Sequence, residues 1–124
     1  MAQAIKTKKI MILDDNANVL KILKRILEKK GYKIVTFERP SHALKYALEE
    51  PLDLIITDLK MPEMDGLEFL VQMKTNFPQL EIIMMTAYAT VDSAVSATKW
   101  GAFNYLKKPF EVQKLYETIA QALH

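Results

Sequence analysis

The sequence of 124 residues contains no cysteine, only two histidines and no long apolar run. Without cysteine, the chain forms no disulfide and no thiolate-ligated metal site. The histidines, His42 and His124, show no pattern of partner residues around them. No apolar stretch approaches the roughly 20 residues that a membrane-spanning helix requires, and the N-terminus lacks the apolar segment of a secretion signal. We therefore expect a cytoplasmic protein that does not contact a membrane.

Neither sign of charge predominates, since 17 basic and 15 acidic residues give a net charge of +2. Such a balance gives no reason to expect direct nucleic-acid binding. Apolar residues make up 50% of the chain and charged residues 26%, as in ordinary globular proteins. One hydrophobic core is the norm at this length, so we expect residues 1–124 to form a single domain.

Short apolar runs alternate five times with segments of helical periodicity, which predicts an α/β fold. We expect a parallel sheet with helices on both faces, the doubly wound arrangement. The predicted strands are residues 9–13, 33–37, 52–57, 81–86 and 103–106. The third and fourth are continuously apolar, as central strands are, whereas two lysines after the fifth suit a strand at the sheet edge.

Apolar residues three and four positions apart predict helices whose apolar side faces the sheet. They are Val19, Leu23, Ile26 and Leu27 in the first helix, Leu67, Leu70, Val71 and Met73 in the third, and Val112, Leu115, Ile119 and Leu123 in the last. The last helix begins near Glu111. Gly31, Pro78 and Gly101 are typical of the positions that follow a helix.

Polar residues stand at the end of the predicted strands or just beyond them. Asp14 and Asp15 follow the first strand, Asp58 follows the third, Thr86 ends the fourth, and Lys108 follows the fifth. Ligands of open α/β sheets bind outside the carboxyl ends of the strands. We therefore expect these side chains to meet at one edge of the sheet.

Three neighbouring carboxylates repel one another unless a cation lies between them. Oxygen ligands without histidine or cysteine favour Mg²⁺, with Mn²⁺ as the alternative. In such a site Asp58 could act as a nucleophile toward phosphorus, while Thr86 and Lys108 donate hydrogen bonds to the transferred group. Taken singly, each of these residues has an ordinary structural interpretation, such as a helix cap, for which Asn16 or Asn18 also qualifies. Their joint placement favours the shared site.

The chain resembles the receiver domains of two-component response regulators, the CheY-like superfamily, over essentially its whole length. The motifs that carry the resemblance are Ile12-Leu13-Asp14-Asp15, Thr57-Asp58-Leu59-Lys60-Met61-Pro62, Asp65-Gly66, Met85-Thr86-Ala87 and Lys108-Pro109-Phe110. The resemblance implies a flavodoxin-like sheet in the strand order 2-1-3-4-5. It also implies a signalling domain and not an enzyme. The only intrinsic chemistry expected of this domain is self-phosphorylation and autodephosphorylation.

The resemblance implies that Asp58 is the phosphoacceptor and one of the metal ligands. Asp15 would bind Mg²⁺ directly, Asp14 through a water molecule, and Lys60 through its backbone carbonyl. Thr86, the Ala87 amide and Lys108 would bind the phosphoryl group. The family also predicts a cis peptide bond before Pro109.

In such domains a threonine and an aromatic residue form a conformational switch, and Thr86 and Tyr105 occupy these positions. Phosphorylation would draw Thr86 toward the new charge and let the Tyr105 ring turn inward. The face formed by the fourth helix, the fifth strand and the fifth helix would then change. Lys60 and Tyr88 should overhang the site, so we also expect them to tune dephosphorylation by hindering the attacking water.

Expected partners are a histidine kinase or phosphotransfer protein upstream and an output domain or protein downstream, with dimerisation on phosphorylation. The stretch from Met85 to Leu106 resembles receivers of nitrogen-regulation-type transcription activators, and sporulation-relay receivers share its Thr-Ala-Tyr element. Three other classes stay open at this point. They are a flavodoxin-like electron carrier, a haloacid-dehalogenase-type phosphatase and a pseudo-receiver that only binds partners.

Overall fold

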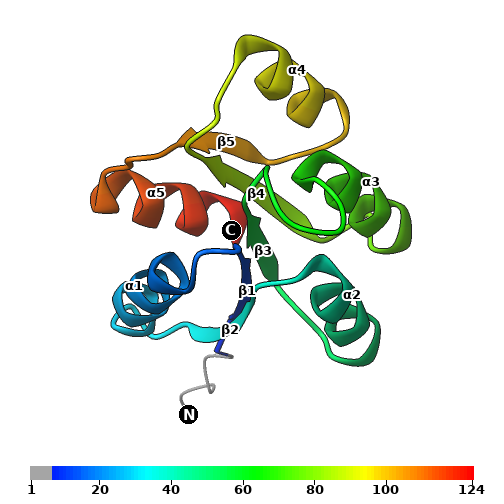
Figure 1. The fold of residues 1–124 in the computed structure, drawn as a ribbon. Helices are drawn as coiled ribbons and strands as arrows, with labels where there is room; N and C mark the ends of the chain where they lie inside the picture. The colour runs from blue at the N-terminus through cyan, green and yellow to red at the C-terminus, as the bar shows by residue number, and fades with distance from the viewer. Residues whose placement is uncertain (1–6) are drawn as a thin grey trace.

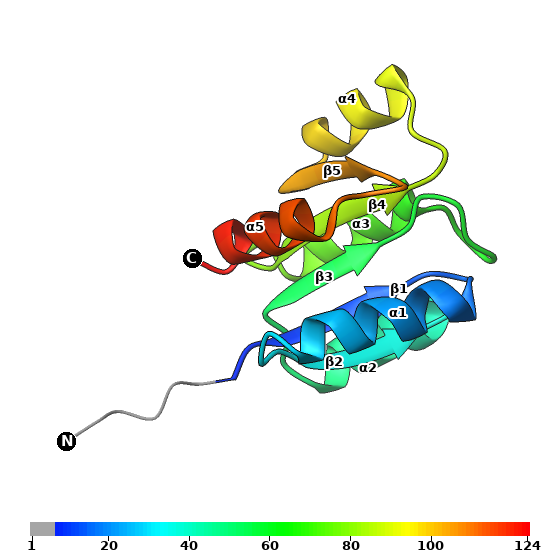
Figure 2. The same ribbon diagram turned by 90° about the vertical axis from the view of Figure 1, so that its left-hand side faces the viewer.

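The computed structural model describes residues 7–124 and contains a five-stranded parallel sheet in the order β2-β1-β3-β4-β5. The strands are β1 (Lys9–Leu13), β2 (Lys33–Phe37), β3 (Leu54–Thr57), β4 (Glu81–Thr86) and β5 (Asn104–Lys107). Figures 1 and 2 show the sheet at the centre of the molecule with helices on both sides. The predicted fold class and strand order are confirmed.

Five helices connect the strands or follow the last one. They are α1 (Ala17–Glu28), α2 (Pro40–Glu49), α3 (Gly66–Asn76), α4 (Val91–Lys99) and α5 (Val112–Ala122). Helices α1 and α5 cover one face of the sheet, and α2, α3 and α4 lie on the other (Figure 1). Among the described residues, no helix is long and apolar enough to cross a membrane.

The strands bury side chains on both faces, which explains their uninterrupted apolar sequences. In β1, Ile10 and Ile12 pack into the core under α1 and α5, while Met11 and Leu13 pack into the core under α2 and α3. Successive side chains of a strand point to opposite faces. The sheet is therefore a rigid platform whose carboxyl edge presents the polar residues.

Three strand boundaries differ from the prediction, one in β3 and two in β5. Strand β3 begins at Leu54, not at residue 52, since the Asp53 carboxylate accepts a hydrogen bond from the Lys9 amide at 2.8 Å. Strand β5 begins at Asn104 and ends at Lys107, each one residue later than predicted, and Phe103 before it is 37% exposed.

Two apolar stripes were also wrong in detail. In α5, Val112 is 43% exposed at the first turn, whereas Leu115 and Ile119 are buried. In α3, the fully buried aromatic residue is Phe69, which the predicted stripe omits, and Val71 is only partly buried. The α5 stripe is therefore right from Leu115 onward and wrong only at its first turn, whereas the α3 stripe missed a buried residue.

Candidate functional site

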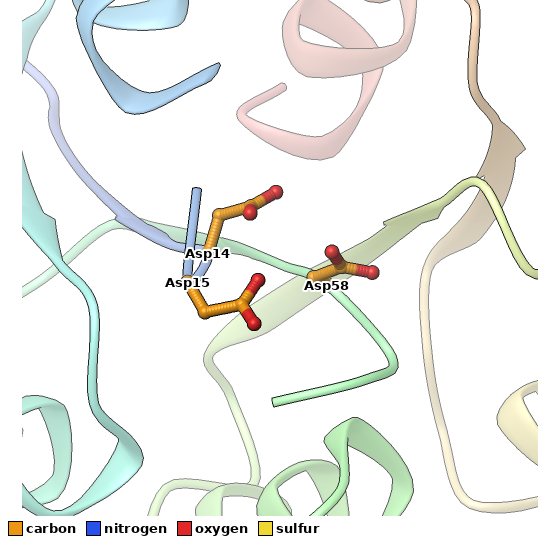
Figure 3. A group of neighbouring side chains, drawn as sticks. All are labelled: Asp14, Asp15 and Asp58. Atoms are coloured by element: carbon orange, nitrogen blue, oxygen red, sulfur yellow. The ribbon is translucent and has the colours of Figure 1, made fainter. Parts of the chain in front are cut away.

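The acidic residues after β1 and β3 meet at the carboxyl edge of the sheet. Asp14, Asp15 and Asp58 each place one carboxylate oxygen within 4.8 Å of the others. Figure 3 shows the Asp14 and Asp15 side chains leaving the end of β1 on the side where Asp58 lies. Asp14 and Asp58 are buried, with 3% and 7% of their surface exposed, while Asp15 is exposed. The cluster is thus buried at Asp14 and Asp58 and open to solvent at Asp15.

A separate residue caps α1, which leaves both aspartates before it free for the cluster. The Asn16 side chain accepts hydrogen bonds from the amides of Asn18 and Val19 at 2.9 and 3.2 Å. Asp14 accepts only the Asn16 amide through Oδ1, at 2.9 Å, and keeps Oδ2 for other partners. The capping interpretation of Asp14 and Asp15 therefore does not apply.

Lys108 reaches the cluster from the segment after β5. Its Nζ lies 2.5 Å from Oδ2 of Asp14 and 3.3 Å from Oδ2 of Asp58. Burial by itself would lower the pKa of Lys108, but the hydrogen bond and charge of Asp14, together with Asp58, outweigh it and raise the pKa. The lysine therefore remains a cation at neutral pH. Burial raises the pKa of the Asp14 carboxyl, and the hydrogen bond from Lys108 opposes that rise.

The Asp58 side chain has one oxygen held by the backbone and one facing Lys108. Oδ1 accepts a hydrogen bond from the Leu59 amide at 2.6 Å, and Oδ2 is the atom nearest Lys108 Nζ. The Asp58 amide donates to the Leu13 carbonyl at 2.9 Å, which extends the β1–β3 pairing by one residue. These bonds fix the carboxylate relative to both strands.

The backbone around Asp58 also requires the glycine that begins α3. A Cβ atom at Gly66 would lie 2.2 Å from the Asp58 carbonyl oxygen and 2.8 Å from Cα of Leu59. The Gly66 amide donates to the Leu59 carbonyl at 2.6 Å. Gly66 was not predicted as a site residue, and its position one residue after a capping Asp65 is the signal that could have identified it.

Thr86 ends β4 beside the cluster and is completely buried. Its Oγ1 accepts a hydrogen bond from the Tyr88 amide at 3.0 Å, and its carbonyl accepts one from the Lys108 amide at 2.8 Å. Ala87, the next residue, is exposed. The peptide bond between Lys108 and Pro109 is cis.

Lys60 and Tyr88 come from the β3–α3 and β4–α4 connections and contact each other. Lys60 Nζ lies 5.0 Å from the centroid of the Tyr88 ring, a cation–π contact. Both residues are exposed, and Tyr88 keeps 58% of its surface accessible. The two connections that flank Asp58 and Thr86 are therefore bridged by a contact between side chains.

Tyr105 in β5 is hydrogen-bonded to α4 through Ser93, a residue that was not predicted to be part of the site. Its hydroxyl lies 2.5 Å from Oγ of Ser93, and the two oxygens share a hydrogen bond. Ser93 also completes the capping box of α4 with Thr90. A capping box starting at Thr90 was the available signal, because it places Ser93 on the first turn of α4, but the contact with Tyr105 could not be read from the sequence.

Comparison with known proteins agrees with this geometry. The family model described as "Response regulator receiver domain" matches residues 10–120. The chain belongs to the response regulator receiver domain family, and it is a signalling domain of the two-component type.

Its curated relatives include larger transcriptional regulators. The transcriptional regulatory protein ZraR of Klebsiella oxytoca is 40% identical over 114 residues, which are 92% of this chain and 26% of that protein. The DNA-binding transcriptional regulator NtrC of Escherichia coli (strain K12) is 36% identical over 114 residues, 92% of this chain and 24% of that protein. The chain therefore spans about a quarter of the length of these relatives.

Solved structures of receivers superimpose closely on the chain. The beryllofluoride-activated NtrC4 receiver domain dimer gives a TM-score of 0.91 at 35% identity and covers 94% of this chain and 97% of its own. Response regulator protein TrrA from Thermotoga maritima, in complex with Mg²⁺ and BeF, gives 0.87 at 34% identity and covers 94% of this chain and 100% of its own. The chain is thus homologous in sequence to NtrC and ZraR, and in structure to the NtrC4 receiver domain.

Proposed function

We propose that Asp58 accepts a phosphoryl group from a histidine kinase or phosphotransfer protein in a Mg²⁺-dependent reaction. The observation that carries the proposal is the acidic cluster itself, in which Lys108 contacts two of the three carboxylates, those of Asp14 and Asp58. In this proposal residues 1–124 act as a single receiver domain in the cytoplasm.

The donor set fits a small, hard divalent cation. Three carboxylates within 4.8 Å supply oxygen ligands only, and Asp15 is the exposed member that solvent reaches. We expect Asp15 and Asp58 to bind Mg²⁺ directly, Asp14 through a water molecule and Lys60 through its carbonyl, with Mn²⁺ as a substitute. When bound, the cation neutralises charge on the transferring group.

The transfer uses Asp58 as the nucleophile. A bond forms between a carboxylate oxygen and phosphorus, while the bond from phosphorus to the donor breaks and the donor leaves with its electron pair. The donor atom is a histidine nitrogen of the kinase or an oxygen of a small acyl phosphate. Lys108, Thr86 and the Ala87 amide donate hydrogen bonds to the phosphoryl oxygens.

The direct test is incubation with acetyl phosphate, with and without Mg²⁺. We expect the intact mass to increase by one phosphoryl group only when Mg²⁺ is present, and the label to map to the peptide that contains Asp58. Steady turnover of a phosphomonoester would favour the phosphatase class instead. Absence of any Mg²⁺-dependent adduct would contradict the proposal.

The contact between Lys60 and Tyr88 supports a role in the lifetime of the phosphorylated state. Because the two side chains meet at 5.0 Å across the loops that flank the site, they restrict the path of the attacking water. We expect Tyr88→Ala and Lys60→Asn each to lose the phosphoryl group several-fold faster than wild type, measured as decay of the phosphorylated mass after removal of acetyl phosphate. Trp100→Ala, which removes the ring of the remote Lys99–Trp100 pair, is the matched control. If Tyr88→Ala and Lys60→Asn lost the phosphoryl group at the same rate as wild type and Trp100→Ala, this role would be contradicted.

We further propose that Thr86 and Tyr105 couple phosphorylation to the face formed by α4, β5 and α5. The hydrogen bond between Tyr105 and Ser93 holds the ring against α4 and opposes its inward turn. Loss of this bond should destabilise the conformation with the ring against α4 by about 1 kcal/mol. The equilibrium should then shift roughly fivefold toward the phosphorylated-like conformation. Tyr105→Phe removes only the shared hydroxyl and Ser93→Ala also weakens the cap. Both should move α4 and β5 amide NMR shifts toward those of beryllofluoride-loaded wild type, and unmoved shifts would count against this role.

The relatives suggest the kind of output. ZraR and NtrC are transcriptional regulators, so we propose an output domain or protein downstream of the α4–β5–α5 face, with dimerisation on phosphorylation. DNA binding in such a system would belong to the output part, and we expect this chain not to bind nucleic acid directly. The balanced net charge of +2 is consistent with that division.

A further inference from the structure

One residue near the phosphoacceptor has an unusual backbone conformation. Glu63 lies in the connection between Asp58 and α3, and its φ of +73° places it in the left-handed region. Within residues 7–124 no other residue apart from glycine has a positive φ. A side chain with a Cβ disfavours this region, so the surrounding contacts must hold Glu63 there.

The contacts that hold Glu63 come from α2. Its Oε1 accepts a hydrogen bond from the Ser41 amide at 2.9 Å, and its Oε2 accepts one from the Ser41 hydroxyl at 3.0 Å. The backbone hydrogen bond from Ser41, followed by the hydroxyl bond, lowers the pKa of Glu63, so the carboxylate is ionised at neutral pH. Both oxygens of one side chain are thus engaged by a single residue 22 positions away.

Helix α2 lacks a cap of its own, which explains why the carboxylate fits there. The N-cap residue Arg39 makes no capping hydrogen bond through its side chain, and the first turn contains no acidic residue. Helix N-termini have unsatisfied amides and a partial positive charge, both of which favour a carboxylate. Glu63 therefore supplies the missing cap from a different part of the chain.

The same two hydrogen bonds anchor the loop that follows the phosphoacceptor. At its base the loop is closed by the bond from the Gly66 amide to the Leu59 carbonyl, and near its tip the Met64 amide bonds to the Pro62 carbonyl. Both of these bonds lie within the loop and its junction with α3. Between them, the two hydrogen bonds from Ser41 join the tip of the loop to helix α2.

We infer that Glu63 and Ser41 form a clamp that positions the β3–α3 loop, and with it the Lys60 carbonyl, for binding of the divalent cation. The inference rests on the proposed function, which makes that carbonyl a ligand. Glu63 is a positioning residue in this scheme, because it is three residues from Lys60 and reaches α2 instead of the acidic cluster. Releasing the clamp leaves all three aspartates in place but frees the loop that carries the fourth ligand.

The test compares Mg²⁺ affinity with stability in variants of the clamp. Glu63→Asn suits the left-handed conformation, yet its shorter side chain loses both bonds to Ser41. We expect its Kd for Mg²⁺, measured by calorimetry, to rise about fivefold, the factor that one net hydrogen bond contributes. Glu63→Gln keeps the length and an acceptor and should lie between this variant and wild type. Glu68→Gln removes a charge from the first turn of α3 and serves as the control.

A double-mutant cycle tests whether Glu63 and Ser41 act through their contact with each other and not through a general loss of stability. Ser41→Ala removes the hydroxyl bond but keeps the backbone amide bond, so it should weaken Mg²⁺ binding less than Glu63→Asn does. Adding it to Glu63→Asn should produce little further loss, because Glu63→Asn has already removed both bonds. Amide hydrogen exchange at Lys60 and Met61 should accelerate in both single variants without metal. If wild type binds no Mg²⁺, the proposed function fails. If wild type binds and the clamp variants bind equally well, whatever their stability, the inference is overturned while the proposed function stands.

Discussion

Replacing Asp58 by asparagine is expected to abolish phosphorylation by acetyl phosphate and Mg²⁺. The amide is nearly the same shape as the carboxylate, so its oxygen can still accept the Leu59 hydrogen bond that Oδ1 accepts at 2.6 Å. It lacks the charge that makes the side chain a nucleophile and that Lys108 contacts through Oδ2. We expect no increase in intact mass under conditions that label wild type fully, with an unchanged circular dichroism spectrum.

Asp53→Asn is the matched control for this experiment. Asp53 lies immediately before β3, at the opposite end of the same strand, and its carboxylate accepts the Lys9 amide. This variant removes the same charge and should still be phosphorylated. A labelled Asp58→Asn protein would instead move the acceptor to another carboxylate, and mapping the label would show whether that is Asp14 or Asp15.

Gly66→Ala is expected to lower both stability and phosphorylation more than the same substitution at Gly31 or Gly101. The new Cβ would meet the Asp58 carbonyl oxygen at 2.2 Å and Leu59 Cα at 2.8 Å, and both are backbone atoms that no rotamer change can move away. Overpacking of this kind costs about 3 kcal/mol. Relief requires β3 and α3 to separate, which displaces Asp58. Misplacement by about 1 Å slows a positioned reaction roughly 100-fold.

Gly31→Ala separates the steric effect from the general cost of replacing glycine. Gly31 has a φ of +90°, and a Cβ there would have nothing within 4 Å. Its replacement should cost about 1 kcal/mol through the left-handed backbone alone and leave the phosphorylation rate unchanged. Urea unfolding gives the stabilities, and initial rates of acetyl phosphate labelling give the activities. If Gly66→Ala resembled Gly31→Ala in both, the close approach of α3 to Asp58 would not matter.

The convergence of the site residues could be predicted because topology alone determines it. Parallel strands place their carboxyl ends at one edge, so polar residues that follow β1, β3, β4 and β5 must gather there whatever the loops do. Asp14, Asp58 and Lys108 meet for this reason, because the order β2-β1-β3-β4-β5 brings the ends of their strands to the same edge.

The clamp and the Tyr105 contact could not be predicted, because each depends on the path of a loop or the tilt of a helix. From the sequence, Glu63 is an ordinary surface residue between Pro62 and Met64, and its neighbours give no indication of a contact with Ser41. From the sequence, Ser93 is expected only to lie in the first turn of a helix. Only the packed structure brings its hydroxyl to Tyr105. The error at Val112 has the same origin, since periodicity fixes a stripe but not where the helix begins to contact the sheet.

The position of Lys108 has a consequence for which ions the site can retain. Three carboxylates and one ammonium give the cluster a formal charge of minus two, and two of the carboxylates are buried. A monovalent ion leaves the cluster negative, a trivalent ion makes it positive, and a divalent ion brings it to neutrality. Valence is therefore selected by the lysine as much as by the aspartates, and a chain without Lys108 would favour more highly charged ions such as lanthanides.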